Sequence, residues 1–158
     1  MNTVPITVRG AQLLKDELQH LKHKERPAVI NAISEARAQG DLSENAEYDA
    51  AKERQSFIEG RIAELEGKLS AAQIIDPTLL DAEGRVVFAS TVTLEDLDSG
   101  DKVTYQIVGD DEADLKEKKV SISSPIARAL IGKYAGDTAE VKTPNGVREY
   151  EVLEVQYI

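Results

Sequence analysis

Between positions 48 and 72, apolar residues recur at alternating spacings of three and four, and no other pattern in the chain limits its fold as strongly. The run consists of Tyr48, Ala51, Gln55, Ile58, Ile62, Leu65, Leu69 and Ala72, with Gln55 as its polar exception. This spacing places the side chains on one narrow stripe of a helix. Such a stripe suits a helix that packs on one partner helix and exposes its other faces to water.

The partner helix is expected to run from about Gly10 to Gln39. Its apolar positions follow the same spacing, at Ala11, Leu14, Leu18 and Leu21, then Val29 or Ile30, Ile33 and Ala36. Proline inside a helix removes one hydrogen bond and usually bends the helix. We therefore expect a long helix that bends near Arg26 and Pro27.

The link between these helices is short, and it forces them into an antiparallel hairpin. Gly40 can take the left-handed conformation that ends a helix, and Asp41 or Ser43 can cap the next one. Two helices of about 30 residues give a hairpin ~45 Å long, at 1.5 Å per residue. Core burial alone does not explain so long a rod, which suggests that its tip reaches into a partner.

The chain beyond Pro77 has a different pattern, of short alternating strands and turns. Strands are expected at 85–94, 102–108, 119–123, 139–142 and 147–155, with a short helix from Pro125 to about Ile131. Asn145-Gly146 is a strong hairpin signal, and Ser124 can cap the short helix. The sequence thus predicts an α+β protein with a helical domain at 1–76 and a small antiparallel-sheet domain at 77–158.

Composition narrows the possible functions. With 19 Lys+Arg against 29 Asp+Glu, the net charge of -10 disfavours binding to naked nucleic acid over a broad surface. The chain has no cysteine, which excludes thiolate metal sites and cysteine nucleophiles. No stretch has the ~20 apolar residues of a membrane span. We expect a soluble, cytoplasmic protein with no membrane partner.

Asp41 and Glu44 stand three residues apart at the tip of the expected hairpin. Carboxylates are hard oxygen ligands that suit Mg²⁺, although two of them rarely hold the ion without help. They could instead share an ion already held by a partner and position a water on it. An Asp-x-x-Glu segment at a helix start is also a capping box, and spacing alone favours that interpretation.

A resemblance to a known family covers essentially the whole chain. The segment Gly-Asp-Leu-Ser-Glu-Asn-Ala-Glu-Tyr at 40–48 resembles the tip signature of the Gre transcript cleavage factors, in their GreA branch. Residues 123–133, Ser-Ser-Pro-Ile-Ala-Arg-Ala-Leu-Ile-Gly-Lys, are similar to the family's C-terminal signature. Shorter matches lie at 7–10, 35–37, 59–62 and 107–114.

The resemblance implies an N-terminal antiparallel coiled coil and a C-terminal domain similar to FK506-binding proteins. It implies that the C-terminal domain holds the rim of the RNA polymerase secondary channel while the coiled coil brings its tip to the active centre. There the tip stimulates the polymerase's own cleavage of the 3′ end of backtracked RNA. We expect a monomer that is not itself an enzyme and that binds no cofactor alone.

The resemblance also implies roles for particular residues. Asp41 and Glu44 match the pair that assists the polymerase's Mg²⁺. Contacts to RNA or polymerase near the tip are expected from Arg37, Ser43, Asn45, Tyr48 and Lys52. Lysine at position 52 replaces an expected arginine and loses the bidentate fork. Without the resemblance, Arg37 and Lys52 would be interpreted as ordinary solvated charges.

Two segments of the C-terminal half are candidate polymerase contacts. The first consists of Ser124, Pro125, Ile126, Ala127 and Arg128, for which a capped structural helix is an equal explanation. The second is the acidic run of Asp110, Asp111, Glu112 and Asp114, which could meet a basic surface or serve solubility.

Three other functions compete with transcript cleavage. A polymerase inhibitor of the same shape would carry an altered tip, and this tip is unaltered. A prolyl isomerase needs an aromatic-lined pocket, whereas the chain after residue 76 has few aromatic residues, and fold similarity alone is a weak argument for activity. A plain coiled-coil adaptor would not bind polymerase at all.

Overall fold

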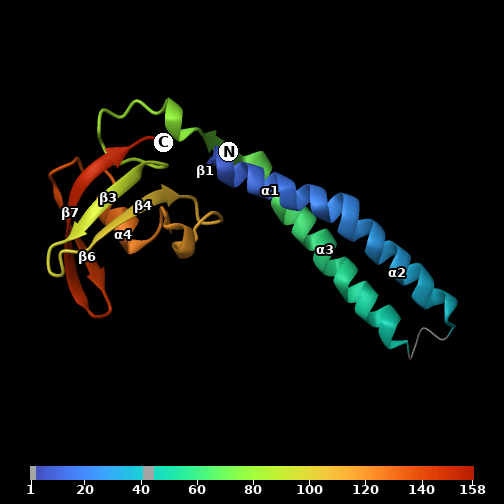
Figure 1. Ribbon diagram of the computed structural model, residues 1–158. Coiled ribbons are helices and arrows are strands. Elements are labelled where there is room, and N and C mark those ends of the chain that lie inside the picture. The colour runs from blue at the N-terminus through green and yellow to red at the C-terminus, as the bar shows by residue number, and fades with distance from the viewer. Residues whose placement is uncertain (1–2, 41–44) are drawn as a thin grey trace. The chain divides into compact units, whose positions relative to one another are not determined.

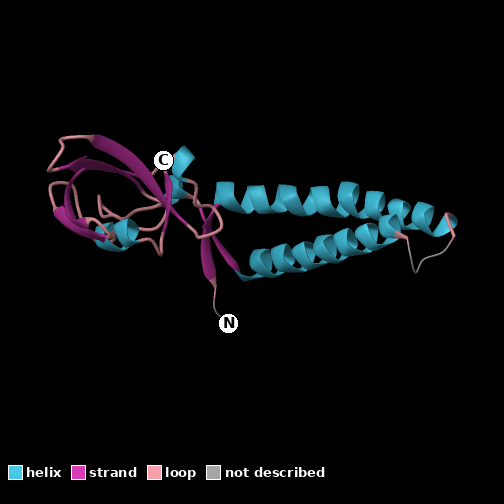
Figure 2. Cartoon of the chain, turned by 90° about the horizontal axis from the view of Figure 1, so that it is seen from below, coloured by secondary structure: helices cyan, strands magenta, loops and turns pink. Residues whose placement is uncertain are grey.

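The computed structural model describes residues 3–40 and 45–158 and divides them between two compact units. Ala11–Ala72 form a helical hairpin, and Thr3–Gly10 join Gln73–Ile158 in the second unit (Figure 1). The predicted boundary at 76 had assigned Thr3–Gly10 to the helical part. These residues belong to the second unit because strand β1 (Val4–Thr7) pairs with strand β2 (Ala72–Ile75), an unpredicted two-stranded sheet visible in Figure 2.

The hairpin consists of an almost uninterrupted first helix and a single second helix. The first helix comprises α1 (Val8–His20), the π-helical turn η1 (Leu21–Glu25) and α2 (Arg26–Ala38). The second is α3 (Ala46–Ala71), which packs against α2 and η1 (Figure 1). The first helix thus begins two residues before the predicted Gly10.

The predicted apolar stripe of α3 faces inward. Ala51, Ile58, Ile62 and Leu65 are buried, and the other four members of the stripe are half-buried. On the first helix the structure decides between the two alternatives, since Val29 is 4% exposed and Ile30 is 52% exposed. The predicted spacing is therefore confirmed on both helices.

The proline of the first helix is accommodated by the π-helical turn before it. The backbone N–H of Arg26 donates to the carbonyl of Leu21, five residues back. Pro27 then occupies the first turn of α2, where its missing N–H costs least. The sequence predicted a bend near Arg26 and Pro27. The structure has a widened turn just before the proline, and the bend itself stays a prediction.

Ion pairs connect the two helices along the outside of the stripe. They join Glu17 to Arg61, Lys22 to Glu66, Glu25 to Arg54 and Arg26 to Glu59, with N···O distances from 2.6 to 3.2 Å. Hydrogen bonds from the arginines lower the pKa of the Glu17, Glu25 and Glu59 carboxyls below the usual value for glutamate. Exposed pairs of this kind contribute at most ~1 kcal/mol each, so they assist the apolar stripe and do not replace it.

The second unit is a five-stranded sheet with one short helix. The strands are β3 (Thr91–Asp96), β4 (Lys102–Val108), β5 (Lys119–Ser121), β6 (Thr138–Thr143) and β7 (Gly146–Gln156), in the order β5-β4-β3-β7-β6. Helix α4 (Pro125–Leu130) and the 3₁₀ turns η3 (Pro77–Leu79) and η4 (Leu115–Glu117) complete it. Because β4 and β5 run parallel, the predicted all-antiparallel sheet is wrong at this edge.

The core of this unit lies between the curled sheet and α4 (Figure 2). Its fully buried members include Val86, Leu94, Ile107, Leu130 and Val152. The predicted strand at 85–94 is wrong before Thr91, because Ala89 has a left-handed backbone (φ 73°) and the Ser90 hydroxyl donates to the carbonyl of Val87. The chain turns there before β3 begins.

The fold class is therefore mixed α+β, with an N-terminal helical hairpin and a C-terminal curled sheet. In the described part of the chain, no helix is long and apolar enough to cross a membrane. Similarity of the second unit to FK506-binding proteins, and supercoiling of the hairpin, stay predictions.

Candidate functional site

The candidate site is the end of the hairpin, where the first helix stops and α3 begins. Asp41, Ser43 and Glu44 lie outside the described residues, and the described part of the site consists of the residues on either side of them. Gly40 ends the first helix with a left-handed backbone (φ 111°), as predicted, and its N–H donates to the carbonyl of Arg37 over 3.2 Å.

The Asn45 side chain forms hydrogen bonds with both the beginning of α3 and the end of α2. Its side-chain oxygen accepts a hydrogen bond from the backbone N–H of Tyr48 over 3.0 Å, which makes it the N-cap of α3. Its side-chain nitrogen donates to the carbonyl of Ala36 over 2.7 Å. The Ala36 carbonyl also accepts from the backbone N–H of Gln39 over 3.2 Å, and the Asn45 amide adds a second bond to it, so one amide contacts two helix ends at once.

The cap of α3 differs from the prediction. Asp41 or Ser43 was expected in that role, whereas Asn45 holds it. A capping box on α3 would therefore begin at Asn45 and not at Asp41. The capping explanation for Asp41 and Glu44 consequently has no support from α3.

Two further contacts join the helix ends beside Asn45. The Gln39 side chain donates to the carboxylate of Glu47 over 3.0 Å. The Arg37 guanidinium lies 6.0 Å from the centre of the Tyr48 ring, within the range of a cation–π contact. The sequence singled out Arg37 and Tyr48 separately, and the structure brings them together. Gln39 and Glu47 were missed, because only the turn between them shows that they meet.

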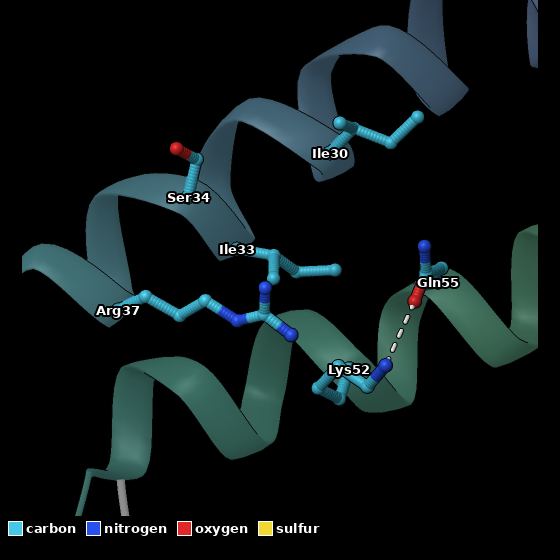
Figure 3. A pocket seen from close by; sticks show the side chains of 6 residues that line it. All are labelled: Ile30, Ile33, Ser34, Arg37, Lys52 and Gln55. Carbon is cyan, nitrogen blue, oxygen red and sulfur yellow. Dashed lines mark hydrogen bonds between the residues drawn. The ribbon is translucent and has the colours of Figure 1, made fainter. Parts of the chain in front are cut away.

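A hollow between α2 and α3 lies close to this end of the hairpin (Figure 3). It is lined by Ile30, Ile33, Ser34, Arg37, Lys52 and Gln55. Arg37 extends from α2 toward α3, and the Lys52 ammonium donates to the side-chain oxygen of Gln55 over 3.3 Å. Both predicted basic residues therefore contribute to one surface, although they come from different helices.

The described residues that line this hollow carry two positive charges and no negative one. A second hollow of the hairpin is lined by Glu25, Ala28, Val29, Ala32, Glu47, Ala50, Ala51 and Arg54, with two carboxylates and one cation. The first hollow is therefore the one of the two that suits an anionic ligand such as a phosphate.

The candidate contacts on α4 divide into buried and accessible residues. Ser124 caps the helix by accepting from the N–H of Ala127 over 3.2 Å, and Pro125 occupies its first turn. The Ala127 side chain is fully buried and Ile126 packs on the core, so the prediction of a contact through Ala127 does not suit its position. Pro125 and Arg128 are exposed, and they are the members of this segment best placed to meet a partner.

The acidic run at 110–114 is largely occupied with the unit's own hydrogen bonds. Asp110 accepts from the hydroxyls of Ser121 and Ser123, which lowers the pKa of its carboxyl. Glu112 accepts from the backbone N–H of Thr7 and Gly109. Asp114 caps η4 through the N–H of Lys116. These contacts favour a structural role over a surface offered to a partner.

Comparison with known proteins agrees across the whole chain. The sequence pattern of the family described as "Transcription elongation factor, N-terminal" matches residues 4–74. The pattern described as "Transcription elongation factor, GreA/GreB, C-term" matches residues 81–157. The two matches cover both structural units.

Individual relatives agree with the family patterns. The chain is 74% identical over 158 residues to the transcription elongation factor GreA of Ralstonia nicotianae and 68% identical over 158 residues to that of Neisseria meningitidis serogroup A, with 100% of each chain covered. Among solved structures, GreA factor homolog 1 (Gfh1) of Thermus thermophilus is 30% identical, with 98% of this chain and 99% of that chain covered and a TM-score of 0.44. On the two family patterns and the two GreA relatives, the chain belongs to the GreA/GreB family of transcription elongation factors, which stimulates transcript cleavage by RNA polymerase.

Proposed function

We propose that the hairpin enters the secondary channel of RNA polymerase and that Asp41 and Glu44 act there on the 3′ end of backtracked RNA. The observation that carries this proposal is the position of Asn45. Because Asn45 caps α3, the two neighbouring acids are not needed for that cap. The hollow lined by Arg37 and Lys52 lies between α2 and α3, close to the end of the hairpin at which Asn45 caps α3.

The donor set at the tip suits a shared magnesium ion. Among the residues that the structure describes, no group of three or more histidine, cysteine, aspartate or glutamate side chains could hold a metal. Asp41 and Glu44 supply hard oxygen ligands, and Mg²⁺ usually takes one or two carboxylates and keeps several waters. We assign both acids to an ion whose other ligands belong to the polymerase. Such an ion, when bound, polarises a phosphoryl oxygen and lowers the pKa of water.

Arg37 and Lys52 are assigned to the extruded RNA. Two cations that line the same hollow neutralise phosphate charge, and they do so without base specificity. Arg37 is also held beside Tyr48, which limits the freedom of its guanidinium. In this arrangement the RNA backbone lies along the hollow, and the acids of the adjacent turn act on it.

The C-terminal unit is assigned to the rim of the channel. Pro125 and Arg128 of α4 are exposed and lie beside the cap residue Ser124. The protein acts as a monomer and carries no nuclease activity of its own, since two carboxylates lack the remaining metal ligands and a substrate cradle. Cleavage is then the polymerase's reaction, which this protein stimulates in the cytoplasm.

The proposal is tested with a stalled, backtracked polymerase complex that carries labelled RNA. The wild type is expected to release a short 3′ fragment, whereas Asp41→Ala and Glu44→Ala bind equally well and release it at least ~100-fold more slowly, the loss of roughly 3 kcal/mol of transition-state stabilisation. If all three proteins bind and none stimulates cleavage, the protein is a regulator that occupies the channel. Fragment release by the protein without polymerase would refute the absence of its own nuclease activity.

A further inference from the structure

Helix α1 begins with a cap that its own sequence leaves incomplete. Thr7 precedes the helix and is 3% exposed, and its hydroxyl accepts a hydrogen bond from the backbone N–H of Gly10 over 3.0 Å. This is the first half of a capping box. The second half is normally a glutamate or glutamine at the position of Gly10, whose side chain accepts from the N–H of the cap residue. Glycine has no side chain to do so.

Glu112 supplies the missing half from 105 residues further along the chain. Its carboxylate accepts from the backbone N–H of Thr7 over 3.1 Å, and the Thr7 hydroxyl donates to its other oxygen. A β-carbon built on Gly10 would overlap the carboxyl group of Glu112, so the carboxylate occupies the space that a side chain at position 10 would take. A negative charge at a helix N-terminus is also favourable electrostatically.

Glu112 is itself held by the turn in which it lies. The N–H of Gly109 donates to the same carboxylate over 2.9 Å. A β-carbon on Gly109 would lie 3.0 Å from the carbonyl oxygen of Pro5 and 3.1 Å from Glu112. The segments 7–10 and 107–114 therefore form one cluster, in which a side chain at Gly10 or Gly109 would crowd the Glu112 carboxylate.

We propose that Glu112 is a positioning residue, which caps α1 from the C-terminal unit and thereby anchors the first turn of the hairpin's leading helix in that unit. Thr3–Gly10 belong to the C-terminal unit, and α1 continues from Gly10 into the hairpin without a break. Glu112 affects cleavage by holding α1, without contact to RNA or metal; this consequence rests on the function proposed above.

The first test needs no polymerase and compares three glycines. Gly10→Ala places a methyl group against Glu112, whereas alanine at Gly60 or Gly67 of α3 meets nothing within 4 Å. Replacing glycine by alanine inside a helix normally stabilises the helix. We expect hydrogen exchange of the first turn of α1 to rise about tenfold in Gly10→Ala, the scale of one lost hydrogen bond to a charged group. Gly60→Ala and Gly67→Ala should slow exchange in α3. Unchanged exchange in Gly10→Ala would overturn the cap.

The second test separates capping from anchoring. Glu112→Ala removes both, whereas the double variant Gly10→Glu with Glu112→Ala restores a capping box within α1 and leaves α1 unanchored. Hydrogen exchange, polymerase affinity and cleavage of backtracked RNA are measured on both. For the double variant we expect protection of the first turn to return to the wild-type level and affinity to stay within about twofold, with cleavage still about tenfold slower.

Recovery of cleavage together with protection in the double variant would show that Glu112 only caps, and it would overturn the positioning role. Failure of the wild type to stimulate cleavage would refute the proposed function instead, while the exchange results would still decide the cap. Glu112→Gln provides a milder variant, because its amide oxygen still accepts from the two N–H groups. It should fall between the wild type and Glu112→Ala in both exchange and cleavage.

Discussion

The helical hairpin and the C-terminal unit support a buried side chain in different ways. In the hairpin, Ile58 is fully buried, yet the residues before and after it, Phe57 and Glu59, are exposed, and burial depends on one partner helix. In the C-terminal unit, Leu94 lies in a cluster contributed by strands and by α4. Two side chains that are equally buried can therefore be packed by different numbers of surrounding elements. A two-helix hairpin exposes its end to a partner, but its buried interior is only one stripe of side chains wide.

Truncation of one buried residue in each unit tests this difference most strongly. Leu94→Ala is expected to lower the free energy of unfolding of its unit by about 4 kcal/mol, toward the upper part of the range for buried leucine. Ile58→Ala should cost about 2 kcal/mol, because a two-helix stripe can close around the missing atoms. Hydrogen exchange at increasing denaturant, followed by mass spectrometry, resolves the two units. Equal losses would contradict the difference in support.

The Asn45 side chain offers a smaller and more local test, at the end of the hairpin. Asn45→Asp keeps a good N-cap for α3 but loses the donor to Ala36, and we expect a cost of about 1 kcal/mol. Asn45→Ala loses both bonds and should cost about 2 kcal/mol. Thermal unfolding followed by circular dichroism checks both. A variant Asn45→Asp as stable as the wild type would show that the bond to Ala36 contributes nothing.

As the pH falls, the hairpin should lose stability before the C-terminal unit does. We expect this effect to be smaller than those of the substitutions above. Paired carboxyls of the hairpin have a lowered pKa, namely Glu17, Glu25, Glu59 and Glu64. Their stabilisation is present above the unfolded value of about 4.3 and is lost as the pH falls through the folded value. In the C-terminal unit, the pKa of the Asp96 carboxyl is lowered chiefly by a hydrogen bond from the Asp98 N–H. The pKa of the Asp110 carboxyl is lowered chiefly by a hydrogen bond from the Ser121 hydroxyl.

The measurement is the unfolding of each unit between pH 5 and pH 3, since these pKa values are all lowered. The exposed ion pairs of the hairpin should also weaken when salt is added at neutral pH, because salt screens exposed charges. Matched loss of stability in both units on acidification would contradict the expectation. A hairpin that is insensitive to both pH and salt would show that its ion pairs contribute nothing measurable.

The two units also differ in how far their sequences predict them. The spacing of apolar residues predicted the inward face of α3, and local signals predicted α4 with its Ser124 cap and the β6–β7 turn. Local patterns did not predict the left-handed Ala89, which stops the expected strand, or the parallel pairing of β5 with β4. Both depend on packing between distant segments, which alternation along the chain does not encode.

The same limit applies to the candidate site. The sequence identified Arg37 and Lys52, and the structure adds that they line one hollow. The sequence alone did not identify Asn45 as the cap that joins two helix ends, because that role depends on the position of Ala36 across the turn. Nor could it pair Thr7 with Glu112, which are 105 residues apart.

The central claim is that Asp41 and Glu44 act through a magnesium ion shared with the polymerase. The most direct measurement is the rate of RNA cleavage in a backtracked complex as Mg²⁺ is varied, at saturating wild type, Asp41→Asn and Glu44→Gln. These variants remove charge with little change of shape. We predict that each needs about tenfold more Mg²⁺ to reach half of its maximal rate, since one charged ligand is lost. An unchanged Mg²⁺ requirement with lower cleavage would contradict the claim and place both acids outside the metal site.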